Sequence, residues 1–264
     1  IVMGANLGTT VTAQLIAFKV TDFVTVFIAL GFGLNIIAKG KKLKYSGQIM
    51  MGFGIMMLGM QMMGNAVAPL RKYQGFVDFI ATFADNPLIG LLAGTVMTCV
   101  VQSSTATIGI LMAMASQGLI PLEGAIPVML GDNVGTCITS VLASLRANRA
   151  AKRVAYSHVL YNLIGSIIFI IFMGWFVDFV LYISPEGDIA RQIANSHTAF
   201  NLLSTVIFLP ITNQFVAFIE LLVPGTDVVI SRQTLLLDVN MVGTPSLAVQ
   251  RATSAVVRVG RMAC

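Results

Sequence analysis

Charged side chains are scarce in this chain of 264 residues. Asp, Glu, Lys and Arg make up 10% of it, and 56% of it is hydrophobic. Soluble domains carry about 25% charged residues, because a water-facing surface needs them. The shortage of charge therefore excludes an ordinary water-soluble domain and predicts a protein that lies in a lipid bilayer.

Residues that bind metals or form disulfides are also few. The chain has three cysteines and two histidines. Cys99, Cys137 and Cys264 form an odd set without metal-ligand spacing, so they are predicted to be small buried side chains. No nucleophile is paired with a base in the sequence. We therefore predict neither an enzyme nor a bound cofactor.

Basic residues occur in short clusters between long apolar runs. Lys and Arg are absent from residues 73–145, 154–190 and 192–231. A nucleic-acid surface would interleave basic and aromatic residues, so no nucleic-acid partner is predicted. Basic clusters between apolar runs are typical of cytoplasmic loops. They predict that the loops at 39–44 and 146–153 and the C-terminus are cytoplasmic, and that the acidic turn at 185–188 is outside.

Four stretches are apolar enough to cross a membrane, which takes about 20 residues. They are residues 23–38, 46–70, 154–183 and 189–223. The first needs its flanks to complete a span, and the last two are long enough to tilt or break. Pro210 is expected to kink the last stretch. The sequence thus predicts an all-α polytopic membrane protein.

Gly, Pro, Ser, Thr and Asn repeatedly interrupt the apolar segment 87–145. Irregular backbone at membrane depth survives only inside protein or beside a cavity. Interrupted hydrophobic segments also mark the binding sites of transporters. We predict a re-entrant helical hairpin over residues 87–118 and a discontinuous helix over residues 122–145.

Residues 2–13 resemble residues 129–140. They share the pattern Gly-x-Asn-x-Gly-Thr-x-x-Thr, which pairs Gly4, Asn6, Gly8, Thr9 and Thr12 with Gly131, Asn133, Gly135, Thr136 and Thr139. Internal repeats of this kind occur in many transporters. The same alignment pairs Lys19 with Arg146 and predicts a loop at Lys19 and Asp22. An inverted repeat requires this loop to lie outside.

A second short repeat relates residues 155–162 to residues 194–201. Both contain the pattern Ser-His-x-x-x-Asn, at His158 and Asn162 and at His197 and Asn201. Residues four apart lie on one face of a helix. These side chains are predicted either to form hydrogen bonds between helices or to contribute directly to a site.

The most polar run in the apolar region comprises Gln102, Ser103, Ser104 and Thr105, followed by Thr107. Ser and Thr suit helix N-termini, where free N–H groups and the helix dipole attract anions. The alternative is that these hydroxyls bond back to their own helix. The second interrupted run, residues 131–136, favours the interpretation as a site.

The predicted site has no Lys, Arg or His, and its one charged residue, Asp132, is negative. Each helix N-terminus supplies only about half a positive charge. An anion entering a site of low dielectric constant would therefore need a cation bound beside it. Oxygen ligands suit a small hard cation. Sodium coupling follows as a hypothesis, in which Asp132 either binds the cation or stays protonated.

These motifs together resemble the type II sodium-phosphate cotransporter family, particularly its bacterial branch. That family carries a Gln-Ser-Ser-Ser run and a Gly-Ala-Asn-x-Gly-Thr-Thr run in each of two inverted repeats. Residues 102–105 match the first run, and residues 4–10 match the second without departure. Residues 131–137 match the second run with Asp132 and Cys137 in place of Ala and Thr. The likeness covers about residues 1–223.

The resemblance implies sodium-driven transport of inorganic phosphate across the plasma (inner) membrane, and leaves homo-oligomerisation open. It implies one central site for phosphate and sodium, lined by Gln102, Ser103, Ser104, Thr105, Asn133, Gly135, Thr136, Asn6, Gly8, Thr9 and Thr10. The first repeat's Gln-Ser-Ser-Ser run is missing and the chain opens inside a motif, so we expect further sequence upstream.

The resemblance also divides the chain. Residues 1–45 would end the first transport repeat, and residues 46–230 would hold the second repeat with its flanking helices. Residues 231–264 resemble the linker and start of a PhoU-like cytoplasmic domain, with an ordinary interfacial helix as the alternative. Two other functions stay open: transport of another small anion, and a membrane-bound phosphate sensor or scaffold.

Overall fold

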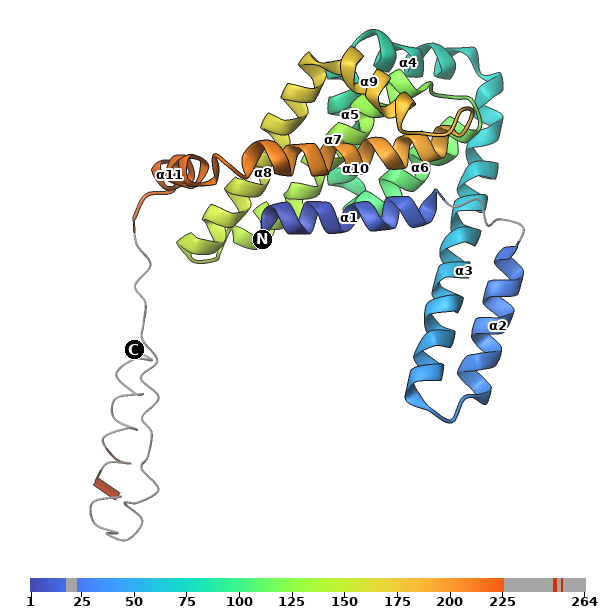
Figure 1. Cartoon of the computed structure of the whole chain (residues 1–264), viewed down its shortest axis with the longest axis horizontal. Coiled ribbons are helices and arrows are strands. Elements are labelled where there is room, and N and C mark those ends of the chain that lie inside the picture. The colour runs from blue at the N-terminus through green and yellow to red at the C-terminus, as the bar shows by residue number, and fades with distance from the viewer. Residues whose placement is uncertain (18–22, 226–248, 251–252, 254–264) are drawn as a thin grey trace. The chain divides into compact units, whose positions relative to one another are not determined.

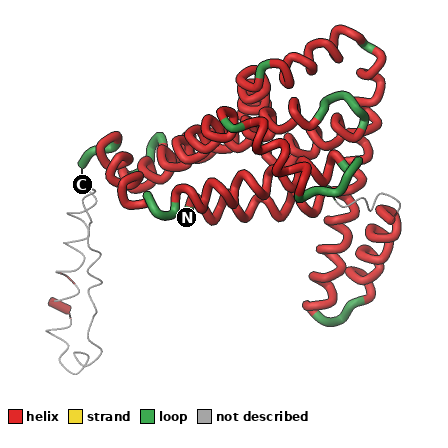
Figure 2. Tube along the Cα trace, turned by 45° about the horizontal axis from the view of Figure 1, so that its top comes forward, coloured by secondary structure: helices red, strands yellow, loops and turns green. Residues whose placement is uncertain are grey.

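The computed structural model describes residues 1–17, 23–225, 249, 250 and 253. Within these residues every regular element is helical, as the sequence predicts (Figure 1). The elements are α1 (Val2–Ile16), α2 (Val24–Ile37), α3 (Lys41–Val67), the 3-10 helix η2 (Ala68–Lys72), α4 (Gln74–Asp85), α5 (Pro87–Val101), α6 (Ser104–Ser116), α7 (Leu122–Ser144), α8 (Arg149–Ile171), α9 (Met173–Tyr182), α10 (Ile189–Phe208) and α11 (Thr212–Leu222). Short loops join the helices from α2 to α11 (Figure 2).

Several helices have the length and composition of membrane spans. Three such segments lie in the described residues, namely α3 with η2, α7 and α8. Two bent pairs meet the same criteria only together: α4 with α5, bent by 113°, and α10 with α11, bent by 87°. The second bend falls around Pro210, so the predicted kink is confirmed.

The predicted discontinuous helix over residues 122–145 is wrong. α7 is one continuous helix with Pro127 inside it. Its glycines lie within the helix without breaking it. Gly131 and Gly135 instead allow the backbone of α5 to approach closely. A Cβ at Gly131 would overlap the Leu91 carbonyl of α5, and one at Gly135 would lie 2.5 Å from the Thr95 carbonyl oxygen.

The hairpin predicted over residues 87–118 consists of two helices, α5 and α6. Asn86 caps α5 by accepting from the Leu88 N–H, with Pro87 in the first turn. α5 ends at Val101, and its C-cap residue Gln102 has a left-handed φ of 56°. Ser103 then caps α6. The break is therefore where the polar run predicts it, and re-entry into a membrane stays a prediction.

α2 and α3 form an antiparallel pair with closely spaced axes (Figure 1). Gly31 and Gly47 face each other, and a Cβ on either would lie 2.7 Å from the other's carbonyl oxygen. The loop predicted at 39–44 is wrong for most of its length, since α3 already begins at Lys41. Lys is a good helix former, and exposure of these side chains lets the helix begin within the basic cluster.

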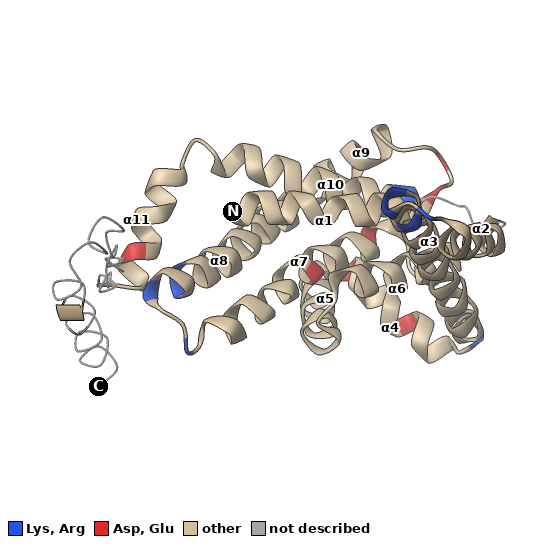
Figure 3. Cartoon of the chain, turned by 90° about the horizontal axis from the view of Figure 1, so that it is seen from below, with Lys and Arg blue, Asp and Glu red and all other residues tan. Residues whose placement is uncertain are grey.

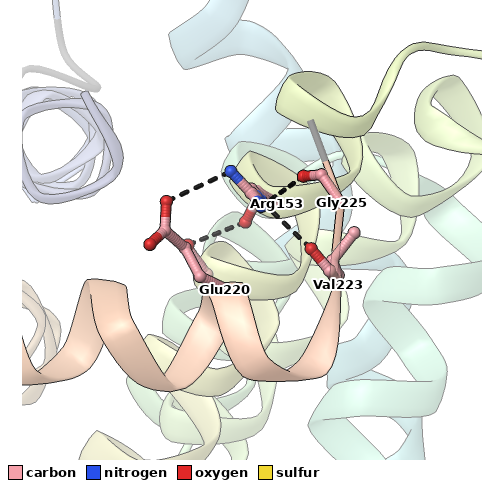
Figure 4. Close-up of polar contacts among 5 residues, drawn as sticks. Arg153, Glu220, Val223 and Gly225 are labelled. Carbon is pink, nitrogen blue, oxygen red and sulfur yellow. Dashed lines mark hydrogen bonds and ion pairs between the residues drawn. The ribbon is translucent and has the colours of Figure 1, made fainter. Parts of the chain in front are cut away.

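Charged side chains gather near helix ends and leave most helix bodies uncharged (Figure 3). Arg153, near the start of α8, binds the end of α11 (Figure 4). Its guanidinium donates to the carbonyls of Val223 (3.1 Å) and Gly225 (2.8 Å) and to the Glu220 carboxylate (3.1 Å). An Arg at these terminal carbonyls satisfies backbone acceptors that a helix end leaves free.

The helices lie in one unit, Ile1–Gly225, and α7 is its most buried element. Thr226–Cys264 form a second unit. Two predictions lie outside the described residues: the loop at Lys19 and Asp22, and nearly all of the PhoU-like segment.

Candidate functional site

The Asn of the first repeated motif joins α1 to α8. Asn6 Nδ2 donates to the side-chain oxygen Oδ1 of Asn162 at 3.0 Å, and Asn6 Oδ1 lies 2.9 Å from His158 Nε2. Ser140 of α7 completes the group at 3.3 Å from His158 Nδ1. Asn6 is 5% exposed and Asn162 is fully buried. Both nitrogens of His158 therefore have protein partners.

The Asn of the second motif joins α7 to α10 in the same way. The Asn133 oxygen lies 3.3 Å from His197 Nε2 and accepts from Asn201 Nδ2 at 3.4 Å. All three residues are buried. Each motif Asn thus meets the His and the Asn of one Ser-His-x-x-x-Asn helix.

The paired hydrogen bonds bear on the two repeats seen in the sequence. The patterns at His158 and His197 form hydrogen bonds between helices, which was one of the two predicted roles. The correspondence is what related halves would give, and the inverted repeat itself stays a prediction. Asn133 and Asn6, both predicted to bind phosphate or sodium, are held in buried positions by these bonds.

The start of α6 presents the polar run. Ser103 is occupied as the cap, since its hydroxyl accepts from Ala106 N–H at 3.3 Å. The N–H groups of Ser104 and Thr105 belong to the first turn, which has no partners within the helix. In the described part of the chain, the hydroxyls of Ser104 and Thr105 also lack protein partners. Gln102 is the C-cap residue of α5 and is exposed.

A crevice brings residues from three helices together. Its polar lining comprises Thr9 and Thr12 of α1, Ser104 and Thr105 of α6, and His197 of α10. In this conformation the crevice is too narrow to hold a water molecule. Residues nearly 100 positions apart in the sequence thus meet where an anion would face the start of α6.

Most threonines of the two motifs donate to their own helix. Thr9 donates to the Asn6 carbonyl at 2.7 Å, Thr12 to the Thr9 carbonyl at 2.6 Å and Thr136 to the Asp132 carbonyl at 2.8 Å. Their oxygens remain free to accept a hydrogen bond or to contact a cation. Thr10 behaves alike, donating to Leu7.

Asp132 is fully buried between α5, α6 and α7. One carboxylate oxygen accepts from Thr98 at 2.8 Å, and Thr98 lies 3.1 Å from Thr107. The other oxygen has no partner among the described residues. A carboxylate so buried is either protonated or paired with a cation. Its oxygen-rich surroundings suit a hard cation such as sodium.

The structure separates the predicted site residues into groups. Thr9, Ser104 and Thr105 share the crevice, whereas Asp132 lies with Thr98 and Thr107. Gly135 packs on α5, whereas a Cβ added at Gly8 would meet no other part of the described structure within 4 Å. The prediction of a site without His is wrong, because His197 lines the crevice. His197 and Thr12 were not predicted as ligands, although the repeated Ser-His-x-x-x-Asn pattern marked the histidine.

The chain matches the Na+/Pi-cotransporter family model over residues 1–65 and 71–208. The chain belongs to the Na+/Pi-cotransporter family. Membership indicates a transporter rather than an enzyme. It agrees with the resemblance seen in the sequence motifs.

Three relatives cover different shares of the chain, and two of them carry names that refer to phosphate transport. "Uncharacterized protein YqeW" of Bacillus subtilis is 36% identical over 70% of this chain and 60% of its own length. "Putative inorganic phosphate export protein YjbB" of Escherichia coli is 27% identical over 66% of this chain and 32% of its own. "Sodium-dependent phosphate transport protein 2A" of Rattus norvegicus is 40% identical over 23% of this chain and 9% of its own length.

The chain thus matches less than two thirds of the length of each of these relatives. No solved structure matches it.

Proposed function

We propose that this chain is part of a secondary transporter of inorganic phosphate that is coupled to sodium and works by alternating access. The protein would span the plasma (inner) membrane several times, with its C-terminus in the cytoplasm. Family membership supports transport, and the names of two relatives support phosphate as the substrate.

The crevice between α1, α6 and α10 is the observation that carries the proposal. Ser104 and Thr105 offer free first-turn N–H groups and hydroxyls, which suit the oxygens of a phosphate. The crevice is closed to water here, so binding requires α6 and α1 to separate. Such a separation is one step of an alternating-access cycle.

Sodium coupling rests on the charge of the site. The polar lining of the crevice carries no Lys or Arg. A phosphate with one or two negative charges would therefore enter without a compensating side-chain cation, which is costly at low dielectric constant. Asp132, with its unpartnered oxygen, is the proposed cation ligand. Thr98 and Thr107 would supply further oxygens.

Direction of transport separates two versions of the proposal. One relative is named for phosphate export and another for sodium-dependent phosphate transport. Uptake follows if sodium moves inward with phosphate. A sensor or scaffold, or a transporter of another small anion, is the competing function.

Radiolabelled phosphate flux in proteoliposomes of the full-length protein tests the proposal. We expect accumulation only with an inward sodium gradient, and none with potassium in its place. Equal flux with both cations would remove the sodium coupling. Binding of phosphate without any accumulation would instead support a sensor.

A further inference from the structure

His197 of α10 has a ring nitrogen that no group in the described part of the chain satisfies. Its side chain is 2% exposed, and Nδ1 has no hydrogen-bond partner among the residues described. An unsatisfied buried nitrogen is costly, and such exceptions in native proteins call for an explanation. Because His197 lines the crevice, a bound molecule can supply the missing partner.

The hydrogen-bond network determines which nitrogen of His197 carries the proton. Asn133 Nδ2 donates to the Met129 carbonyl at 2.9 Å, and a carbonyl can only accept. The Asn133 oxygen therefore faces His197, so Nε2 must carry the hydrogen of that 3.3 Å bond. In a neutral ring this leaves Nδ1 as a bare acceptor.

The other Ser-His-x-x-x-Asn helix shows the same ring with its second nitrogen satisfied. There His158 Nδ1 lies 3.3 Å from the Ser140 hydroxyl. The repeat aligns Ser140 with Ala13. Ala13 lines the crevice beside His197 and has no hydroxyl to offer. The free acceptor at His197 thus follows from one side-chain difference between the two motifs.

The crevice has acceptors on one side and donors on the other. Thr9 and Thr12 donate their hydroxyl hydrogens to backbone carbonyls of α1. Toward a ligand their oxygens can therefore act only as acceptors, as His197 Nδ1 does. Ser104 and Thr105 supply donors from α6. A ligand that fits both sides has bare oxygens and at least one hydrogen to donate.

We propose that His197 makes the site selective for tetrahedral oxyanions that keep a proton at neutral pH, such as hydrogenphosphate, over those that do not, such as sulfate. The inference rests on the proposed function and specifies its substrate class. The P–OH group would donate to Nδ1 while the other oxygens accept from the start of α6. Sulfate would leave Nδ1 unpaired, and sites built for such a hydrogen strongly reject analogues that lack it.

Two pairs of anions separate the effect of the proton from the effect of size. Phosphate and arsenate retain a hydrogen near neutral pH, whereas sulfate and selenate do not. Inhibition of labelled phosphate transport by arsenate, sulfate and selenate would be measured with the full-length protein in proteoliposomes. We expect arsenate to compete, and sulfate and selenate to compete at least about 100-fold more weakly.

Variants assign the selectivity to His197. Ala13→Ser introduces the hydroxyl that Ser140 provides in the other motif, so it should occupy Nδ1 and raise the KM for phosphate by about 10- to 100-fold. His197→Gln retains a group that can reach Asn133 and removes Nδ1. In both variants, selenate should inhibit phosphate transport at a concentration closer to that needed for arsenate. The ratio of the two inhibition constants, called the arsenate-to-selenate ratio, should therefore move toward one. Ser140→Ala is the matched control and should leave the ratio unchanged, because it alters only His158.

The outcomes are distinct. An unchanged ratio in both variants, or equal competition by arsenate and selenate in the wild type, overturns the role of His197 while phosphate transport stands. Equal competition by arsenate and selenate would indicate that the His197 ring donates from both nitrogens. If Ala13→Ser does not fold, as judged by gel filtration, the ratio in His197→Gln decides. A wild type without phosphate transport refutes the proposed function instead, and anion-dependent thermal stabilisation then tests the selectivity.

Discussion

Individual side chains of the crevice differ in how much of the fold depends on them. Asn133 is buried and holds two partners on α10, so its loss would disturb both structure and site. The Ser104 hydroxyl has no hydrogen-bond partner among the described residues, so its loss is expected to affect the contents of the crevice more than the fold. Both residues stood out equally in the sequence. Only a substitution of Ser104 is expected to change transport without also changing the stability of the fold.

We expect Ser104→Ala to lower phosphate transport by about 10-fold or more without lowering the melting temperature. A hydrogen bond to a charged ligand contributes about 1.5–3 kcal/mol, and no protein contact is lost. Flux in proteoliposomes and thermal unfolding in detergent measure the two effects. Ser116→Ala, at the exposed end of the same helix, is the control. Wild-type flux in Ser104→Ala would remove this residue from the site.

Asp132→Asn tests the cation site. If the carboxylate binds sodium, the sodium concentration for half-maximal transport should rise about tenfold, which corresponds to about 1.4 kcal/mol. The amide keeps the size of the side chain and can still bond Thr98, so the fold should persist. Glu123→Gln, exposed in the first turn of the same helix, is the matched control. An unchanged sodium dependence would place the coupling ion elsewhere.

At the scale of helices, α5 and α7 are held together by glycines. Gly94, Gly131 and Gly135 let the two backbones approach so closely that a Cβ at any of them would meet the opposite main chain. The motif positions equivalent to Gly131 and Gly135 are Gly4 and Gly8 of α1, and nothing lies within 4 Å of where their Cβ would be. The glycines of the motif are therefore packed against another helix in α7 but not in α1.

This difference yields a test of the repeat. Gly131→Ala should destabilise the protein by about 1–3 kcal/mol, because overpacking shifts both helices. Gly4→Ala should be neutral in the 264-residue chain. In the full-length protein an inverted repeat would place a helix like α5 against α1, so Gly4→Ala should then be as destabilising as Gly131→Ala. Thermal unfolding of both variants in both proteins measures this, and a neutral Gly4→Ala throughout would argue against the repeat.

For the molecule as a whole, the chain supplies one polar run for the crevice. It matches 60% of the length of its Bacillus subtilis relative. We expect the 264-residue chain by itself to show no phosphate flux in proteoliposomes and the full-length protein to show it, because a two-repeat site needs the polar run of both repeats. Full activity of the shorter chain would contradict a site shared by two repeats.

The sequence by itself determined the class of the protein, the helical hairpin at the polar run and the bend at Pro210. These follow from local properties: the amount of charge, the length of apolar runs and the backbone limits of proline. The family can also be inferred from short sequence motifs, because their recognition does not depend on the three-dimensional structure.

Tertiary structure alone decided what the glycines of α7 do and which polar residues meet. Gly131 looks like a helix breaker in the sequence, but it is a contact point, because its role depends on the approach of α5. The sequence likewise cannot show that His197 has a free nitrogen. That depends on Asn133 of α7, which bonds His197, and on Ala13 of α1, which lines the crevice with it, and such distances are set only when the helices pack.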